Sequence, residues 1–188
     1  MILTLIELII SGVLLIPIFL IFWKIEFHNP KRTIAYFIFA IYLASVYHFV
    51  GLPTIQFIRF DIHLNLIPLI GMVYDLRSTL LNILLFVPLG FFLPMLWVQY
   101  REQKQTILFG LGITTAIELM QLFTYRVTDI NDIITNVFGT FLGFCLFRFT
   151  KWTRVSKNSK DIFLILGVVF LTMFFIQPKV MNFIYKII

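Results

Sequence analysis

The chain has few charged residues and a single cysteine, and each shortage excludes a class of protein. Only 13% of its 188 residues are charged, whereas 60% are hydrophobic, and its mean hydropathy is +0.97. Soluble domains contain about half apolar and about a quarter charged residues, because much of their surface has to face water. A soluble single domain is therefore excluded. Because Cys145 is the only cysteine, neither an internal disulfide nor a thiolate metal cage can form.

The charge that is present is mainly positive. The chain has 15 Lys and Arg against 9 Asp and Glu, which gives a net charge of +6. In a soluble protein this excess would indicate nucleic-acid binding. Here the basic residues are scattered between long apolar runs, so we expect no nucleic-acid partner. The pattern is typical of a membrane protein with basic loops.

Six apolar runs have the length, or nearly the length, that a helix needs to cross a hydrocarbon core of about 30 Å. They cover residues 2–23, 34–52, 79–100, 106–123, 133–149 and 162–177. The last run is the shortest; it either continues past Pro178 or leaves the tail along the membrane interface. Pro88 and Pro94 in the third run predict a bend or local unwinding of that helix.

Residues 53–78, between the second and third runs, are too polar for a full crossing and too apolar for a free loop. This mixture favours a re-entrant or interfacial segment. We therefore predict an all-α integral membrane protein, a polytopic bundle of five to six transmembrane helices. No linker divides the chain, so residues 1–188 are expected to form a single membrane domain.

The basic residues also predict an orientation, because short cytoplasmic loops are enriched in Lys and Arg. Ten of the 15 lie in the first, third and fifth connections and five on the other side. We therefore expect loops 24–33, 100–105 and 150–161 to be cytoplasmic and loop 124–132 to be outside. With six crossings, both termini would also be outside.

Polar side chains inside the spans are costly and need a reason. On the predicted topology, five of them fall in the same outer leaflet: Glu7, His48, Asn82, Glu118 and Asn136. Those near helix ends can reach the interface, and the amides can join helices. Glu118 lies deeper, and Gln121 shares its helix face, so this pair is the strongest candidate for a functional or obligatory structural role.

A short charged loop follows, in which Arg126, Asp129 and Asp132 are spaced by three. If this loop is one helical turn, the three share a face, and Arg126 either pairs with the acids or offers its guanidinium to a phosphate or carboxylate. Alternatively, Asp132 caps the fifth helix. Further along, Gly139 and Gly143 form a small-residue pair that is typical of close helix packing.

These residues resemble the VanZ-like family of bacterial membrane proteins over about 65–149. Three pieces carry the resemblance: Asn65-Leu-Ile-Pro68, Asn82-x3-Phe86-x-Pro88-x-Gly90, and Glu118-x2-Gln121-x-Phe123-x2-Arg126-x2-Asp129-x2-Asp132-x3-Asn136-x2-Gly139-x3-Gly143. The resemblance implies a multi-pass protein of the bacterial plasma membrane, and the family's namesake is linked to low-level resistance to the glycopeptide teicoplanin. It marks seven signature residues without assigning them a catalytic role: Asn82, Glu118, Gln121, Arg126, Asp129, Asp132 and Asn136.

The sequence leaves the function open and favours binding over catalysis. The first hypothesis is a site at the outer leaflet for an anionic lipid head group or cell-envelope ligand, such as a lipid-linked wall precursor or a glycopeptide. In it, Arg126 holds the anion, and Asn82, Gln121 and Asn136 orient it. Such binding would modulate susceptibility to teicoplanin.

Three alternatives remain. In an intramembrane enzyme that acts on a lipid-linked phosphate, Glu118 would be the general acid or base, and Asp129 with Asp132 would hold Mg²⁺. Asp61 and His63 form only half of a metal site, so we expect no metal centre from them. A small transporter or flippase would need a homodimer. An accessory subunit would dock on an envelope enzyme through Gly139 and Gly143.

Overall fold

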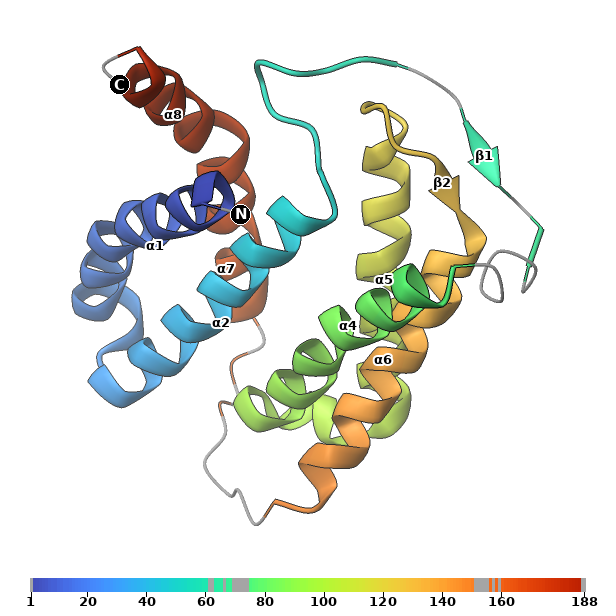
Figure 1. The fold of residues 1–188 in the computed structure, drawn as a ribbon. Helices are drawn as coiled ribbons and strands as arrows, with labels where there is room; N and C mark the ends of the chain where they lie inside the picture. Colours follow the sequence, from blue (N-terminus) through green and yellow to red (C-terminus); the bar gives the residue numbers. More distant parts are fainter. Residues whose placement is uncertain are drawn as a thin grey trace. The chain divides into compact units, whose positions relative to one another are not determined.

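The computed structural model describes residues 2–60, 63–65, 67–68, 75–150, 156, 158 and 160–186. These residues are almost entirely helical (Figure 1), which confirms the all-α prediction. The chain divides into two compact units. Unit 1 comprises Met1–Ile58 and Lys160–Ile188, and unit 2 comprises Arg59–Ser159.

Unit 1 is built from helices at both ends of the chain. They are α1 (Ile2–Phe22) with a π-helical turn η1 (Trp23–Phe27), α2 (Pro30–Phe49), α7 (Lys160–Leu171), a second π-helical turn η3 (Thr172–Ile176) and α8 (Gln177–Tyr185). The last three follow one another without a break, so the final apolar run does continue past Pro178. Pro178 lies in the first turn of α8 and has no N–H to donate to the preceding turn. The carbonyl of Phe174, four residues earlier, accepts instead from the N–H of Ile55 at 3.1 Å.

A tight turn reverses the chain between α1 and α2. His28 adopts a left-handed conformation with φ of 50°, and its N–H donates to the carbonyl of Trp23 at 3.0 Å. The side chain of Asn29 then accepts from the N–H of Arg32 at 3.2 Å and caps α2. Pro30 occupies the first turn of the new helix, which its fixed φ favours. The two helices therefore lie side by side in opposite directions (Figure 1).

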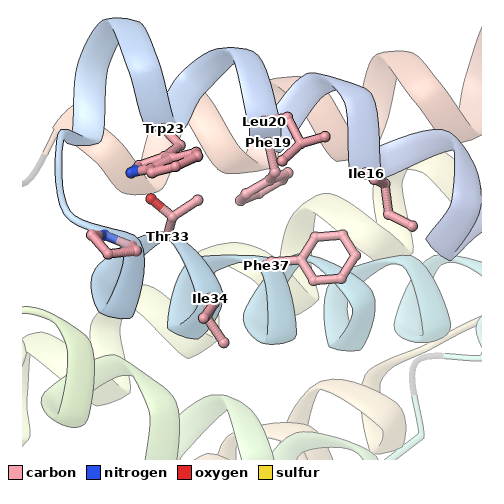
Figure 2. Close-up of a pocket in the computed structure, with 8 residues that line it drawn as sticks. Ile16, Phe19, Leu20, Trp23, Thr33, Ile34 and Phe37 are labelled. Atoms are coloured by element: carbon pink, nitrogen blue, oxygen red, sulfur yellow. The ribbon is translucent and has the colours of Figure 1, made fainter.

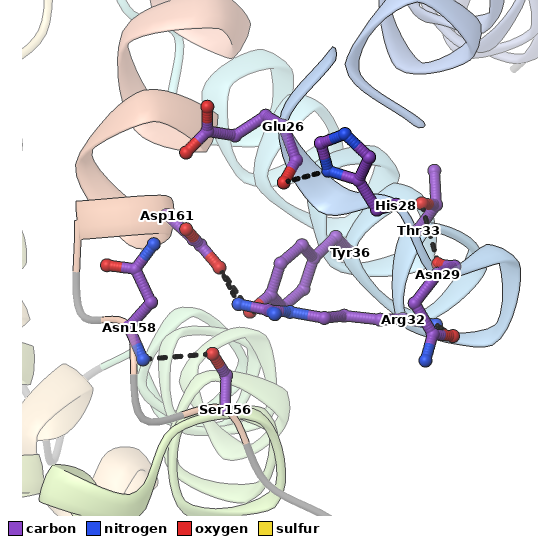
Figure 3. Close-up of polar contacts among 9 residues, drawn as sticks. All are labelled: Glu26, His28, Asn29, Arg32, Thr33, Tyr36, Ser156, Asn158 and Asp161. Atoms are coloured by element: carbon purple, nitrogen blue, oxygen red, sulfur yellow. Dashed lines mark hydrogen bonds and ion pairs between the residues drawn. The ribbon is translucent and has the colours of Figure 1, made fainter. Parts of the chain in front are cut away.

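Polar side-chain contacts join the elements of unit 1. The guanidinium of Arg32 pairs with the carboxylate of Asp161, which is only 2% exposed. The hydroxyl of Tyr36 donates to the same carboxylate at 2.8 Å (Figure 3). Elsewhere in the unit, Nδ1 of His48 lies 3.0 Å from Oε2 of Glu7. Since an unpaired charge is costly in an apolar environment, these contacts account for the acids of α1 and α7, which are Glu7 and Asp161.

Unit 2 is a group of three helices with a short pair of strands at one end. Its elements are β1 (Leu64–Asn65), α4 (Leu76–Leu96), a 3₁₀ turn η2 (Val98–Arg101), α5 (Gln103–Gln121), β2 (Thr128–Asp129) and α6 (Ile130–Arg148). The strands pair in parallel, Leu64 with Thr128 and Asn65 with Asp129. The local unwinding expected at the prolines of α4 is not observed, because the helix is continuous over Leu76–Leu96 and packs along α6.

The contact of α4 with α6 depends on glycine. A Cβ atom on Gly139 would lie 2.2 Å from the carbonyl oxygen of Ile83, and one on Gly143 would lie 1.9 Å from that of Val87. Such distances are far inside van der Waals contact, so any larger residue would push the helices apart. Because α4 of the same chain covers this face of α6, the face is not open to a partner subunit as the sequence had suggested.

Five helical stretches of the described chain are long and apolar enough to cross a membrane: Leu5–Phe27, Pro30–Phe49, Leu76–Leu96, Ile130–Arg148 and Lys160–Tyr185. This agrees with the predicted bundle of five to six transmembrane helices. Helix α5 is not among them because it carries more polar residues, so its crossing stays a prediction. On α1, exposed apolar side chains recur every three or four residues from Leu5 to Leu20, as expected of a helix surrounded by lipid.

The described residues of the segment 53–78 are not helical before Leu76. They form a bridge between Thr54 and Phe57 and the strand β1. Its interfacial position stays a prediction, and Asp61 lies outside the described residues.

Candidate functional site

The polar cluster of unit 2 is centred on Glu118, near the end of α5. Its side chain is 2% exposed. Its Oε2 accepts from the backbone N–H of Asp129 at 2.9 Å, and its backbone carbonyl accepts from the hydroxyl of Thr128 at 3.1 Å. A buried carboxylate with this donor is satisfied in part by the backbone. Glu118 thereby attaches β2 to the last turn of α5.

Asp129 connects three parts of the chain. Its Oδ1 accepts from the backbone N–H and the side-chain amide of Asn131, both at 2.8 Å, and so caps α6. Its Oδ2 accepts from the amide of Asn65 at 2.9 Å. The alternative in which Asp132 caps the helix is therefore wrong: α6 begins at Ile130, and Asp132 lies in its first turn, where the helix dipole favours an acid. The loop is not a helical turn either, because Thr128 and Asp129 are extended.

Asp132 faces α4 instead. Its Oδ1 accepts from the amide of Asn82 at 2.6 Å, which joins the second turn of α4 to the first turn of α6. Arg126 is exposed on the preceding loop, yet its positive charge acts on the carboxylates of both Glu118 and Asp132. The loop therefore carries one exposed cation within electrostatic reach of a buried acid, Glu118, and a half-buried acid, Asp132.

The two remaining amides lie deeper. Asn136 is 3% exposed, and its Nδ2 donates to the hydroxyl of Thr114 on α5 at 2.9 Å. Its Oδ1 is buried and accepts no hydrogen bond from any described residue. Gln121 is 3% exposed, and its backbone carbonyl receives both the N–H and the hydroxyl of Thr124 at 2.9 Å. Neither amide reaches the surface on which Arg126 is exposed.

Basic and aromatic side chains surround the loop. The guanidinium of Arg59 lies 4.9 Å from the ring centre of Tyr125, and the rings of Phe60 and Phe123 are 5.7 Å apart. The N–H of Arg59 also donates to the carbonyl of Phe123 at 3.0 Å, which holds the two segments together. We call these residues and Arg126 the basic–aromatic rim.

Comparison with known proteins identifies the family. The model of the VanZ/LLP1 family matches residues 14–154. This chain belongs to the VanZ/LLP1 family. The match takes in the second part of α1, all of α2 and most of unit 2, beyond the segment 65–149 on which the resemblance was noted. It places the chain among membrane proteins of the VanZ type.

One curated relative supports the assignment. Protein VanZ of Enterococcus faecium is 28% identical over 102 residues, which are 53% of this chain and 62% of that protein. The chain thus matches less than two thirds of its relative's length. No solved structure matches the chain.

The structure brings to this cluster polar residues that sequence reasoning did not assign to the site. Thr114 accepts a hydrogen bond from Asn136, and Thr128 donates one to the carbonyl of Glu118. Asn131 donates to Asp129 and also to the carbonyl of Ile67 at 3.1 Å. Asn65 belonged to a quoted motif but received no role. Of these residues, only Asn131 could have been predicted from the local sequence, because the N–H two residues after an Asp is a common partner of that Asp side chain in a turn.

Asp129 and Asp132 are the two acids that would hold Mg²⁺ if the protein were an enzyme. Among the described residues, no group of three or more His, Cys, Asp or Glu side chains lies together in a way that could hold one. Both oxygens of Asp129 already accept from Asn65 and Asn131. Mg²⁺ between Asp129 and Asp132 stays a hypothesis, and it would have to displace these amide donors.

Proposed function

We propose that this VanZ/LLP1 protein binds the anionic head group of a lipid, or an envelope ligand with the same kind of group, at the basic–aromatic rim. The observation that carries the proposal is the exposure of Arg126 on a loop that is fixed at both ends. At one end the N–H of Arg126 donates to the hydroxyl of Thr124 at 3.2 Å, and at the other the N–H of Asp129 donates to the carboxylate of Glu118 at 2.9 Å. A guanidinium binds phosphate or carboxylate through two parallel hydrogen bonds. Tyrosine and phenylalanine beside it suit the region where hydrocarbon meets head groups.

The carboxylates support the rim rather than contact the anion. Glu118, Asp129 and Asp132 would repel an anionic ligand, and each is already held by an internal donor. Their role in the proposal is to fix the loop 123–129 and to hold the guanidinium in place. The amides of Asn82 and Asn136 are likewise engaged, with Asp132 and Thr114. Arg126 and Arg59 are therefore the groups proposed to contact the ligand.

The family's namesake suggests what such binding would do. If the ligand is a lipid-linked wall precursor or a glycopeptide at the outer face, occupancy of the rim would change the susceptibility of the cell to teicoplanin. An intramembrane enzyme and a flippase are the alternatives, and an accessory subunit would have to dock through a surface other than that of Gly139 and Gly143, which α4 covers.

The test is mass spectrometry of the lipids that the purified protein retains. Arg126→Ala should reduce the retained anionic lipid about fivefold, the effect of about one basic residue near a membrane surface, whereas Arg126→Lys should retain much of it. Arg77→Ala is the matched control, because Arg77 is also exposed in unit 2 and lies outside the rim. Equal retention of one anionic lipid by wild type and Arg126→Ala would overturn the proposal.

A further inference from the structure

A groove runs between α1 and α2 in unit 1. Its volume is about 320 Å³, within the range of small-ligand sites. Side chains from both helices line it, among them Ile16, Leu20 and Trp23 from one side and Thr33, Ile34 and Phe37 from the other (Figure 2). The hydroxyl of Thr33 needs no hydrogen-bond partner from a ligand, because it already donates to the carbonyl of Asn29 at 2.9 Å.

The groove is open on the side of the apolar surface of the two spans. Ile16 is 45% exposed, Leu20 is 55% exposed and Ile34 is 59% exposed. Both helices are among those long and apolar enough to cross a membrane. Water gains nothing in such a groove, because it offers no polar partners. Inside a bilayer, hydrocarbon is the occupant that matches this lining.

One end of the groove adjoins the basic connection between the two helices. Trp23 and Pro30, which lie at the two ends of that connection, both line the groove. Lys24 and Lys31 are exposed there and have no ion pair among the described residues. Arg32 is engaged by Asp161 (Figure 3), and Glu26 is the only acid between residues 24 and 33. The end of the groove therefore carries a net positive charge that complements an anionic head group.

We infer that this groove binds one anionic phospholipid. One acyl chain lies between α1 and α2, and the phosphate of the head group lies against Lys24 and Lys31. Trp23 occupies the level at which tryptophan is enriched, between hydrocarbon and head groups. The site uses no residue of the basic–aromatic rim and belongs to a different unit, so it stands or falls independently of the proposed function.

Tryptophan fluorescence tests the inference directly in a Trp152→Phe background, which leaves two tryptophans. Of these, Trp23 lines the groove and Trp97 is fully buried. The protein is placed in bilayers of unlabelled phosphatidylcholine that contain a small fraction of phospholipid with brominated acyl chains, which quench tryptophan on contact. Brominated phosphatidylglycerol should quench more than brominated phosphatidylcholine at the same fraction. The difference should vanish in Trp23→Phe, which identifies the reporting residue.

Charge and shape are then varied separately. Lys24→Gln and Lys31→Gln should each raise the fraction of brominated phosphatidylglycerol needed for half-maximal quenching about fivefold. Lys179→Gln, in α8, is the matched control and should leave it unchanged. Ile34→Phe fills the groove without a change of charge and should remove the preference, while circular dichroism checks that the helices persist.

Two results would overturn the inference. Equal quenching by the two brominated lipids in the wild type would mean that the groove contacts bulk lipid without selection. Absence of quenching at Trp23, together with crosslinking between cysteines placed at position 34 of two copies, would mean that a second copy of the chain fills the groove.

Discussion

At the scale of single residues, the side chain of Asp129 connects strand β1 to the first turn of α6. It caps α6 through Asn131 and binds the amide of Asn65. We expect Asp129→Ala to lower the free energy of unfolding by about 2–4 kcal/mol. The substitution removes both the helix cap and the half-buried hydrogen bond from the side-chain amide of Asn65. Thermal unfolding in detergent, followed by circular dichroism, measures this.

Asp75 provides the matched control for that change. It caps α4 through the N–H of Ser78 at 3.0 Å and is exposed, so Asp75→Ala should cost only about 1 kcal/mol. Equal losses for the two substitutions would show that Asp129 acts as a helix cap and nothing more.

Glu118 is the second residue whose role the structure makes testable. Its contact is an oxygen that accepts from the N–H of Asp129, and an amide oxygen can accept in the same way. Glu118→Gln should therefore keep stability within about 1 kcal/mol, whereas Glu118→Ala should lose about 2–4 kcal/mol, since a buried N–H is left unsatisfied beside a cavity. If Gln is as damaging as Ala in the same unfolding assay, the negative charge and not the hydrogen bond is what the site requires.

The residues of the cluster could be found in the sequence, but their contacts could not. Asp129 and Asp132 both precede an apolar run, and local rules favoured Asp132 as the cap. The choice is made by β1, which pairs with Thr128 and Asp129 and holds Asp129 extended. Asn65 is 64 residues from Asp129 in the chain, so no local pattern reports this pairing.

At the scale of elements, the packing of α4 on α6 depends on small residues in both helices. Gly139→Ala and Gly143→Ala should each destabilise the protein by about 1–3 kcal/mol, because the added carbon meets a backbone carbonyl that cannot move aside alone. Gly112 in α5 has nothing within 4 Å of an added Cβ. Gly112→Ala should therefore stabilise the protein by up to about 1 kcal/mol through helix propensity.

Opposite signs for these substitutions in one unfolding series would support the close crossing of α4 and α6. Destabilisation by all three would contradict it. The spacing of Gly139 and Gly143 predicted a close helix neighbour but not which helix it is. A small-residue pair describes one surface only, and the matching surface on α4, with Gly90 against the carbonyl of Thr140, has no comparable spacing.

At the scale of the whole molecule, composition predicted the membrane class and most of the helices, because apolar runs of crossing length have few other uses. It left α5 undecided. Its polar residues include Glu118 and Gln121, which are buried among the helices of unit 2. A helix of this kind can cross a bilayer only if its polar face is covered by protein. Hydropathy alone cannot tell whether that cover is present.

Cysteine labelling decides whether α5 crosses. In a Cys145→Ala background, Lys104→Cys and Val127→Cys place single thiols at exposed positions before and after α5. We expect an impermeant maleimide to label position 127 in intact cells and position 104 only after permeabilisation, because loop 100–105 is basic and loop 124–132 is not. Glu26→Cys, in the basic connection 24–33, should behave like position 104. If positions 104 and 127 label from the same side, α5 does not cross, and the rim around Arg126 then faces the same compartment as loop 100–105.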